Sequence, residues 1–312
     1  MSESGFSKIW SAYRQHRQKV KEKRNKPMTF AESAASWIKT LLGAIVVVMI
    51  INGLAVASFV VPTGSMENTV MTGDFLFVNK FIYGPSTPQV VPFLNVPLPF
   101  YRFPGWRDPQ KNDVIVFIFP GNREEVKSAE FQYYLKRCIA TAGDTLLVRD
   151  KRVFVNGKEV KIAPNGVFDE MMPVPSYDVM QTFPARKGFT RDNYGPIRIP
   201  RKGDIISISP DNLPEWFIFI RREGHEVTSN AYSVFIDGKQ VTSYKVQKDY
   251  CFGMGDNRDH SLDSRYWGFI PYENVVGTPM IVYWSWDTNQ PMSELIEKLK
   301  SVRWSRILKI IR

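Results

Sequence analysis

A run of 21 residues without a charged side chain, Leu41 to Val61, most constrains what this chain can fold into. At about 1.5 Å per residue, a helix of that length crosses a hydrocarbon layer of roughly 30 Å. The run is longer than the core of a removable signal peptide, about 7 to 15 residues, and it follows a long leader. We therefore predict an uncleaved transmembrane helix over 41–61. Ala55-Val56-Ala57 resembles a cleavage site, and self-processing there stays open.

The net charge of +10 over 312 residues is concentrated at the two ends. Residues 1–40 hold nine Lys/Arg against three acids, residues 293–312 hold six against two, and the middle of the chain is neutral. Basic ends around a neutral body favour contact with a membrane surface and argue against a nucleic-acid cleft. Because basic residues next to a membrane helix favour the cytoplasmic side, we expect a cytoplasmic N-terminus and an extracytoplasmic body.

Beyond the anchor, the pattern predicts a mainly β body. Apolar runs at 75–78, 114–119 and 133–139 indicate strands, and Asn156-Gly157 and Asp237-Gly238 indicate two-residue hairpins of antiparallel sheet. We expect a core that is interrupted by a smaller β-rich insertion. The predicted parts are a basic cytoplasmic arm (1–40), the helix (41–61), the core's first part (62–144), the insertion (145–250), the core's second part (251–292) and a basic amphipathic helix (293–312).

Two segments have ambiguous roles. Residues 84–112 are rich in proline and aromatic side chains, which suits either insertion into the lipid interface or a stiff surface loop. The amphipathic helix over 293–312 suits either contact with anionic lipid or packing against the body. The two cysteines, Cys138 and Cys251, are expected as buried thiols or as a disulfide. Three histidines and no ligand spacing predict no metal, and we expect no cofactor.

Ser65 is the candidate nucleophile, at the exit of the apolar run in Pro62-Thr63-Gly64-Ser65-Met66. Proline ends a helix and glycine permits a close approach beside the hydroxyl, although an ordinary turn would contain the same residue types. Lys136 is the candidate base if burial among apolar neighbours lowers its pKa from about 10.4, and it is an ordinary strand residue if exposed. Among the histidines, only His260 merits consideration as the base.

A dense polar stretch from Gly255 to Gly268 would be costly to bury unless its groups paired with one another. Asp263 and Arg265 are two residues apart, so on an extended chain they would face the same way and could form an ion pair.

Three stretches resemble the bacterial type I signal peptidases, or leader peptidases. Pro62-Thr63-Gly64-Ser65-Met66 with Gly73-Asp74-Phe75 is similar to the family's serine box, and Tyr134-Leu135-Lys136-Arg137 with Gly143-Asp144 to its lysine box. Gly255 to Gly268 is similar to its final box. Ala140, Ala142 and His260 depart from the residues often found in the family.

The resemblance implies a membrane-bound serine endopeptidase that removes signal peptides from exported precursors. Ser65 would be the nucleophile and Lys136 its general base, with the Thr63 hydroxyl and the Ser65 backbone N–H as the oxyanion hole. Ser261 would hydrogen-bond the lysine amine, and Asp263 with Arg265 would support it. An extended substrate would add as a strand, and shallow pockets would accept its small residues; the matching positions are Phe59, Val61, Met66, Val70, Leu76, Val116 and Leu135.

The expected setting is the bacterial inner membrane, with one crossing, a monomeric protein, precursor and lipid as partners, and no nucleic acid. Three other classes of protein stay open. One is an inactive membrane-anchored scaffold of the same fold, and another is a soluble self-cleaving Ser-Lys repressor. The third is a Ser-His-Asp esterase that uses His260.

Overall fold

The structure is a computed structural model that describes residues 10, 13–15, 29–54, 56–87, 101–169, 171–291 and 293–311. The chain divides into two compact units, Met1–Met49 and Ile50–Arg312. Three features predicted from the sequence lie wholly or largely outside the described residues. They are most of the basic arm up to residue 28, positions 88–100 of the proline-aromatic segment, and Ala55.

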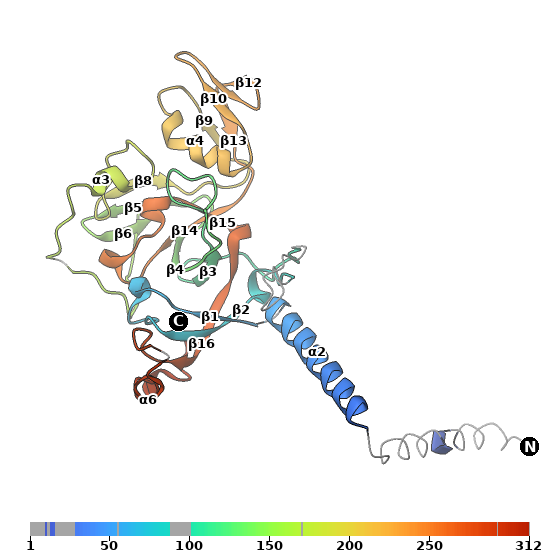
Figure 1. Ribbon diagram of the computed structural model, residues 1–312. Helices are drawn as coiled ribbons and strands as arrows, with labels where there is room; N and C mark the ends of the chain where they lie inside the picture. The colour runs from blue at the N-terminus through green and yellow to red at the C-terminus, as the bar shows by residue number, and fades with distance from the viewer. Residues whose placement is uncertain are drawn as a thin grey trace, which may run out of the picture. The chain divides into compact units, whose positions relative to one another are not determined.

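The apolar run forms helix α2 (Phe30–Leu54), shown in blue in Figure 1. Its first turn is closed by a capping box, in which the backbone N–H of Thr29 donates to the Glu32 carboxylate and the Glu32 N–H donates to Thr29 Oγ1. Residues Phe30–Ile51 have a mean hydropathy of 2.2, and by length and composition this helix can cross a membrane.

This helix begins earlier and ends earlier than the predicted span of 41–61. Val56–Val60 instead forms strand β1, which pairs antiparallel with β2 (Asp74–Asn79). Valine and phenylalanine suit a half-buried strand as well as an apolar helix, so hydropathy alone does not mark this boundary.

The core of the body is a seven-stranded antiparallel sheet, in the order β1-β2-β16-β3-β4-β14-β15. Residues far apart in sequence meet in it, since β16, from late in the chain, lies between β2 and β3, and β4 lies between β3 and β14. Figure 1 labels all seven strands of this sheet. The remaining strands are β3 (Val114–Ile118), β4 (Tyr133–Ala140), β14 (Tyr250–Met254), β15 (Ile270–Pro271) and β16 (Val275–Ser285).

Residues 145–245 form three smaller sheets and two helices. Asn156-Gly157 and Asp237-Gly238, all at positive φ, turn the chain between β6 and β7 and between β11 and β12, which confirms both predicted hairpins. The mainly β fold is likewise confirmed. The elements are β5 (Thr145–Arg149), β6 (Arg152–Val155), β7 (Lys158–Val160), α3 (Asp178–Gln181), β8 (Tyr194–Arg198), β9 (Ile205–Ser207), α4 (Leu213–Arg222), β10 (Val227–Ser229), β11 (Val234–Ile236), β12 (Lys239–Val241) and β13 (Ser243–Lys245).

Apolar packing joins these small sheets to the large one. One cluster combines Ile139 and Phe252 of the large sheet with Leu146, Ile199 and Phe219 of the smaller elements. A second cluster lies around the start of the body and includes Val61, Met66, Leu76, Val116 and, from the C-terminus, Ile311. The smaller sheets therefore share a core with β4 and β14.

The C-terminal segment differs from the continuous helix expected over 293–312. Within the described residues 293–311, only Leu295–Lys300 is α-helical (α6), followed by a 3-10 turn, η5 (Trp304–Arg306), and an extended stretch that pairs at Ile310 with Ile281 of β16. Polar contacts explain the difference: the Lys298 amine donates to the carbonyls of Asp287 and Gln290, at 2.8 and 2.6 Å, and Arg306 forms a buried ion pair.

The two cysteines are free thiols, each 0% exposed. Burial raises the pKa of the Cys251 thiol well above its usual value. We predict that iodoacetamide labels neither cysteine in the folded protein and labels both after unfolding in denaturant without reductant, as counted by mass spectrometry. A fully unfolded chain that takes up no label would contradict this and indicate a disulfide.

Candidate active site

Ser65 lies in a 3-10 turn, η1 (Gly64–Met66), which follows β1. Asn257 fixes this turn twice, because its backbone N–H donates to the Ser65 carbonyl and its side-chain amide donates to the Gly64 carbonyl, both at 3.1 Å. Thr63 precedes the turn in an extended conformation, φ −136° and ψ 157°. The chain therefore presents the Ser65 hydroxyl from a short turn whose carbonyls are held.

Lys136 meets Ser65 from strand β4. Its Nζ donates to Ser65 Oγ at 2.7 Å and to the Leu135 carbonyl at 3.2 Å. The side chain is only 4% exposed, and its Nζ lies 5.6 Å from the centre of the Tyr134 ring. The structure thus brings together the two residues predicted as nucleophile and base, which lie 71 positions apart.

Burial has the electrostatic effect on Lys136 that a base requires. It disfavours the charged amine and lowers the pKa of Lys136 from its usual 10.5 to about 8. Asp263 and Asp256 raise this pKa in part, while the positive charge of Arg265 lowers it further. At pH 7 about one amine in ten is therefore neutral and able to accept a proton.

A buried ion pair beside the site joins three separate segments. Arg137 Nε and Nη2 donate to the two carboxylate oxygens of Asp256 at 2.8 and 2.6 Å, and Thr69 Oγ1 donates to Asp256 Oδ2 at 2.6 Å. Asp256 thereby links the lysine strand to the loop after Ser65. We did not single out Arg137, Asp256 or Asn257 from the sequence, although all three lie within the matched motifs.

Asp263 and Arg265 form the second ion pair, with both side chains almost fully buried. Arg265 Nε and Nη2 donate to the two oxygens of Asp263 at 2.9 and 2.8 Å, and the Gly255 N–H donates to Asp263 Oδ2 at 3.1 Å. Burial by itself raises the pKa of Asp263, but Arg265 and these hydrogen bonds hold it below its usual value. The pair closes at the start of a short helix, α5 (Ser264–Trp267), rather than along an extended chain.

The structure does not show the hydrogen bond that we expected between Ser261 and the lysine amine. The Ser261 hydroxyl is buried beside Gly255, but it forms no hydrogen bond within the described part of the chain, including to Lys136. The Lys136 amine in this structure donates to Ser65 Oγ and to the Leu135 carbonyl. A Cβ on Gly255 would lie 2.2 Å from Ser261 Oγ and 2.5 Å from the Ser65 carbonyl oxygen, so only glycine fits there.

A cavity of about 630 Å³ opens at Ser65 and Lys136. Six of the seven predicted substrate-binding side chains line it, and Thr63 lies at it as well. Val70 does not: it is fully buried in the apolar cluster behind the wall. The six that line it are Phe59, Val61, Met66, Leu76, Val116 and Leu135.

Several residues that we did not predict also line this cavity. The Tyr133 ring packs edge-on against Phe59, with ring centres 4.8 Å apart, and His260 and Leu262 contribute from the stretch after Asp256. Alternation along the apolar strand Tyr133–Ile139 was the available signal for Tyr133. In the described part of the chain, no hydrogen bond joins the His260 ring to Ser65.

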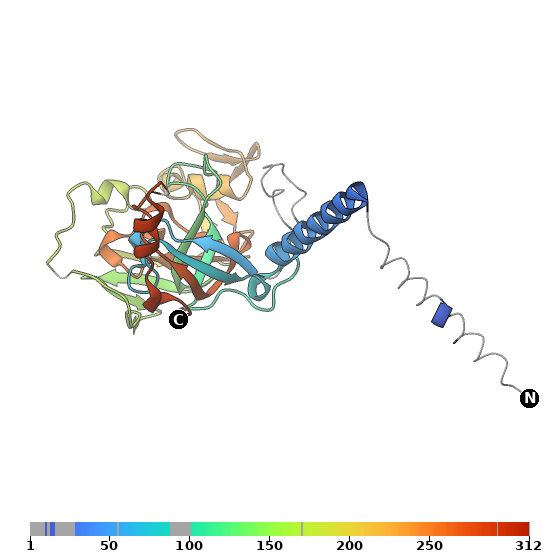
Figure 2. The same cartoon turned by 60° about the horizontal axis from the view of Figure 1, so that its bottom comes forward.

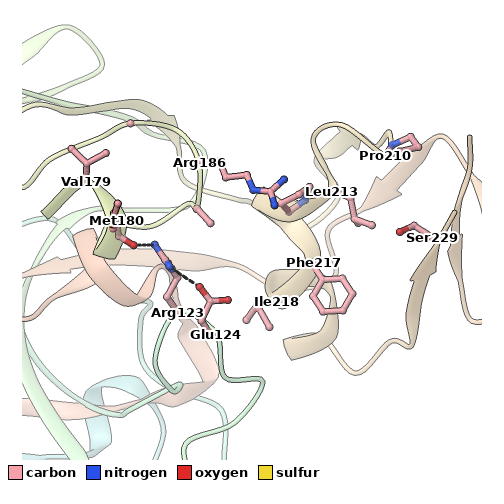
Figure 3. Close-up of a pocket in the computed structure, with 13 residues that line it drawn as sticks. Arg123, Glu124, Val179, Met180, Arg186, Pro210, Leu213, Phe217, Ile218 and Ser229 are labelled. Atoms are coloured by element: carbon pink, nitrogen blue, oxygen red, sulfur yellow. Dashed lines mark hydrogen bonds and ion pairs between the residues drawn. The ribbon is translucent and has the colours of Figure 1, made fainter. Parts of the chain in front are cut away.

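A second cavity, of about 750 Å³, lies between helix α4 and the loop that carries Arg123 and Glu124 (Figure 3). Its lining is mostly apolar, with Met180, Leu213 and Phe217 among the contributors. The Arg123 guanidinium donates hydrogen bonds to the Glu124 carboxylate and to the Met180 carbonyl, as the dashed lines show. No nucleophile and base meet in this lining, so the chemistry is assigned to the cavity at Ser65.

The comparisons with known proteins point the same way. The family described as "Signal peptidase, peptidase S26" matches residues 34–284. The chain belongs to this family. Two proteins named signal peptidase I from Helicobacter pylori, strains 26695 and J99, are 29% and 30% identical to it, each over 91% of this chain and 95% of the relative. A protein named signal peptidase I from Pseudomonas fluorescens is 28% identical to this chain, over 86% of this chain and 77% of the relative.

Family membership confirms the resemblance drawn from the three motifs. Together with the apolar helix α2, it makes the chain a membrane-anchored signal peptidase. A solved signal peptidase I from Enterococcus faecalis aligns at 21% identity over 55% of this chain and 97% of its own, with a TM-score of 0.24, which is too low for a comparison of the two folds.

Gly253 provides a test of how tightly the amine is placed. A Cβ at this position would lie 3.0 Å from Lys136 Cβ and 2.9 Å from Ile270 Cδ1. We predict that Gly253→Ala displaces Lys136 and lowers kcat by about 10- to 10²-fold, since small misplacements of reacting groups are costly. Precursor turnover is the measurement. It is made at a temperature at which the variant is folded, as urea unfolding establishes.

Gly157→Ala is the matched control. Gly157 has positive φ, +76°, and a Cβ there meets nothing within 4 Å. It should lower the free energy of unfolding through backbone strain while leaving kcat unchanged. Equal kcat losses in the two variants would contradict a local effect on Lys136.

Proposed function

We propose that this protein is a serine endopeptidase that removes N-terminal signal peptides from exported precursors, with Ser65 as nucleophile and Lys136 as general base. The observation that carries the proposal is the 2.7 Å contact between Ser65 Oγ and an amine that is 4% exposed. Family membership and the names of the relatives support the substrate class.

The reaction follows from the positions of these groups. Ser65 Oγ attacks the scissile carbonyl carbon and passes its proton to the neutral Lys136 amine. When the tetrahedral intermediate collapses, Lys136 returns that proton to the departing amine, which leaves an ester on Ser65. A water molecule then attacks the ester and gives one proton to Lys136. The bond between the acyl carbon and Ser65 Oγ breaks, Lys136 returns that proton to Ser65 Oγ, and the released carboxylic acid of the signal peptide ionises to a carboxylate.

The oxyanion is assigned to the Ser65 backbone N–H and the Thr63 hydroxyl. The Ser65 N–H belongs to the turn that Asn257 holds and Thr63 directly precedes that turn, so these donors are preorganised where charge develops. One such donor contributes about 10² to 10³ in rate. Asp263 and Arg265 support Lys136 through the charge balance around its amine, and Ser261 supports it by packing against Gly255.

Substrate selection is assigned to the cavity beside Ser65. Apolar side chains of β1, β2, β3 and β4 line it, which suits small side chains of an extended peptide. β1 is the edge strand of the large sheet, so its open side can accept the peptide as a further strand. Val70 contributes by filling the space behind this wall.

The finer setting is part of the same proposal. The N-terminus lies in the cytoplasm, the single helix crosses the bacterial inner membrane, and the body acts outside the cytoplasm as a monomer in contact with lipid. The charge distribution and helix α2 support this topology. The division of the catalytic core into 62–144 and 251–292 is supported by the site itself, because Ser65, Lys136 and Ser261 all lie outside 145–250.

We predict that wild-type protein in liposomes cleaves a precursor after an Ala-x-Ala sequence. Ser65→Ala removes the attacking oxygen and Lys136→Ala the proton acceptor, so each should lower cleavage by at least about 10³-fold. Mass spectrometry of the products identifies the cut, and the acyl-enzyme on Ser65 is sought after acid quench.

His260→Ala is the matched control for these two variants. It alters a side chain at the same cavity and should leave the rate within about threefold of wild type, because the amine already supplies the base. Lost cleavage in His260→Ala with retained cleavage in Lys136→Ala would instead identify a Ser-His esterase type of site. No cleavage by folded wild type would indicate the inactive scaffold.

The pH dependence tests the base separately. Because burial lowers the pKa of Lys136 to about 8 and the neutral amine is the active form, kcat/KM should rise about tenfold per pH unit below 8 and level off above it. Initial rates between pH 6 and 10 measure the profile. A profile without a break near 8, or one whose plateau disappears in His260→Ala, would reject the lysine.

A further inference from the structure

The loop that follows Ser65 is held by the C-terminal segment of the same chain. Three basic side chains of that segment reach it: Arg303 Nη1 donates to the Thr72 carbonyl at 2.8 Å, Lys309 Nζ donates to the Asn68 carbonyl at 3.2 Å, and Arg306 pairs with Asp74. Figure 2 shows the C-terminal segment, in dark red, beside β2 and β16. We refer to residues 67–74 as the nucleophile loop.

Arg306 makes the strongest of these contacts. Its Nε lies 2.9 and 3.1 Å from the two oxygens of Asp74, its Nη2 lies 2.5 Å from Asp74 Oδ2, and Nη2 also reaches the Thr69 carbonyl at 3.5 Å. Asp74 is 0% exposed and Arg306 is 9% exposed, so this bidentate pair is shielded from water. Removing one partner would leave a buried charge uncompensated.

Asp74 connects Arg306 to the backbone of the nucleophile loop and to strand β16. Its Oδ2 accepts the Met71 N–H at 2.8 Å, and its Oδ1 accepts the Ser285 hydroxyl at 2.7 Å. The same segment is secured at its other end, where Thr69 Oγ1 donates to Asp256 and the Val70 N–H donates to the Met66 carbonyl. The nucleophile loop is thus fixed between the Asp256 pair and the Asp74 pair.

Apolar packing extends the same contact under the cavity. Ile311 is buried in the cluster that contains Val61, Met66 and Leu76, three residues that line the substrate cavity. Its N–H donates to the Met280 carbonyl at 3.0 Å, so the end of the chain is anchored on β16. The C-terminal segment therefore contacts both the nucleophile loop and the back of the cavity wall.

We propose that Arg306 is a positioning residue for the reaction: through Asp74 it fixes the nucleophile loop and so holds Ser65 Oγ at the Lys136 amine. This rests on the proposed role of Ser65. Arg306 touches neither Ser65 nor the cavity, so it acts on the distance between the reacting groups and not on substrate affinity or on the surroundings of the amine.

Arg306→Ala and Arg306→Lys in the full-length protein test the proposal in liposomes. The alanine variant should lose about 10- to 10²-fold in kcat, with KM within about twofold of wild type and the pH profile still centred near 8. The lysine variant keeps one charge for Asp74 and should recover most of the loss. Arg303→Ala, which removes a single contact to the loop, should lower kcat by about two- to fivefold.

Arg222→Ala is the stability-matched control. Arg222 is a half-buried arginine that also holds backbone carbonyls, those of Gly121, Asn122, Glu125 and Trp267 at the end of α5, but it makes no contact with the nucleophile loop. It should lower the free energy of unfolding and leave kcat per folded molecule unchanged. Equal kcat losses in Arg222→Ala and Arg306→Ala would overturn the proposal, as would wild-type kcat in folded Arg306→Ala.

Hydrogen exchange gives a readout that does not depend on cleavage. Arg306→Ala should speed amide exchange in residues 67–74 by about tenfold or more and leave β5 and β6 as in wild type, with Arg306→Lys in between. Unchanged exchange in 67–74 would overturn the proposal even if no substrate were cleaved. Wild type without cleavage but with this exchange pattern would reject the proposed function and retain the positioning contact.

Discussion

The contact between the Lys136 amine and the Ser65 hydroxyl depends on taking a lysine out of water. At 4% exposure the charged amine loses much of its solvation, and the same burial that costs folding free energy lowers its pKa to about 8. The surrounding structure has to meet that cost. The large sheet enforces this burial by placing Lys136 within an apolar strand, with a glycine, Gly253, where any larger residue would press on it.

Three buried ion pairs lie around this contact. Arg137 with Asp256, Arg265 with Asp263 and Arg306 with Asp74 are each buried and at least doubly hydrogen-bonded, which limits the penalty of removing charges from water. Each pair also joins segments: the lysine strand to the loop after Ser65, the short helix α5 to the backbone at Gly255, and the C-terminal segment to the nucleophile loop. Three ion pairs, each from a different part of the chain, thus hold the structure around Ser65.

The comparison between sequence and structure shows where local patterns suffice. Asn156-Gly157 and Asp237-Gly238 indicate hairpins because their backbone requires positive φ, and they form them. The limits of the apolar helix were less accurate, because Val56–Val60 suits a strand as well, and pairing with β2 decides it. The C-terminal helix was predicted over too long a range, because helical spacing cannot reveal that Lys298 and Arg306 find partners inside the body.

The sequence by itself determined the chemical inventory: an apolar helix, a presented serine, a lysine in an apolar strand and a polar stretch rich in paired charges. These follow from residue type and spacing along one segment. Only the tertiary structure decided which groups meet. Ser65 and Lys136 are 71 positions apart and Asp74 and Arg306 are 232 apart, and the Ser261 hydroxyl is buried without a hydrogen bond in the described part of the chain. Burial and partner choice are properties of contacts between distant segments, and no local pattern encodes them.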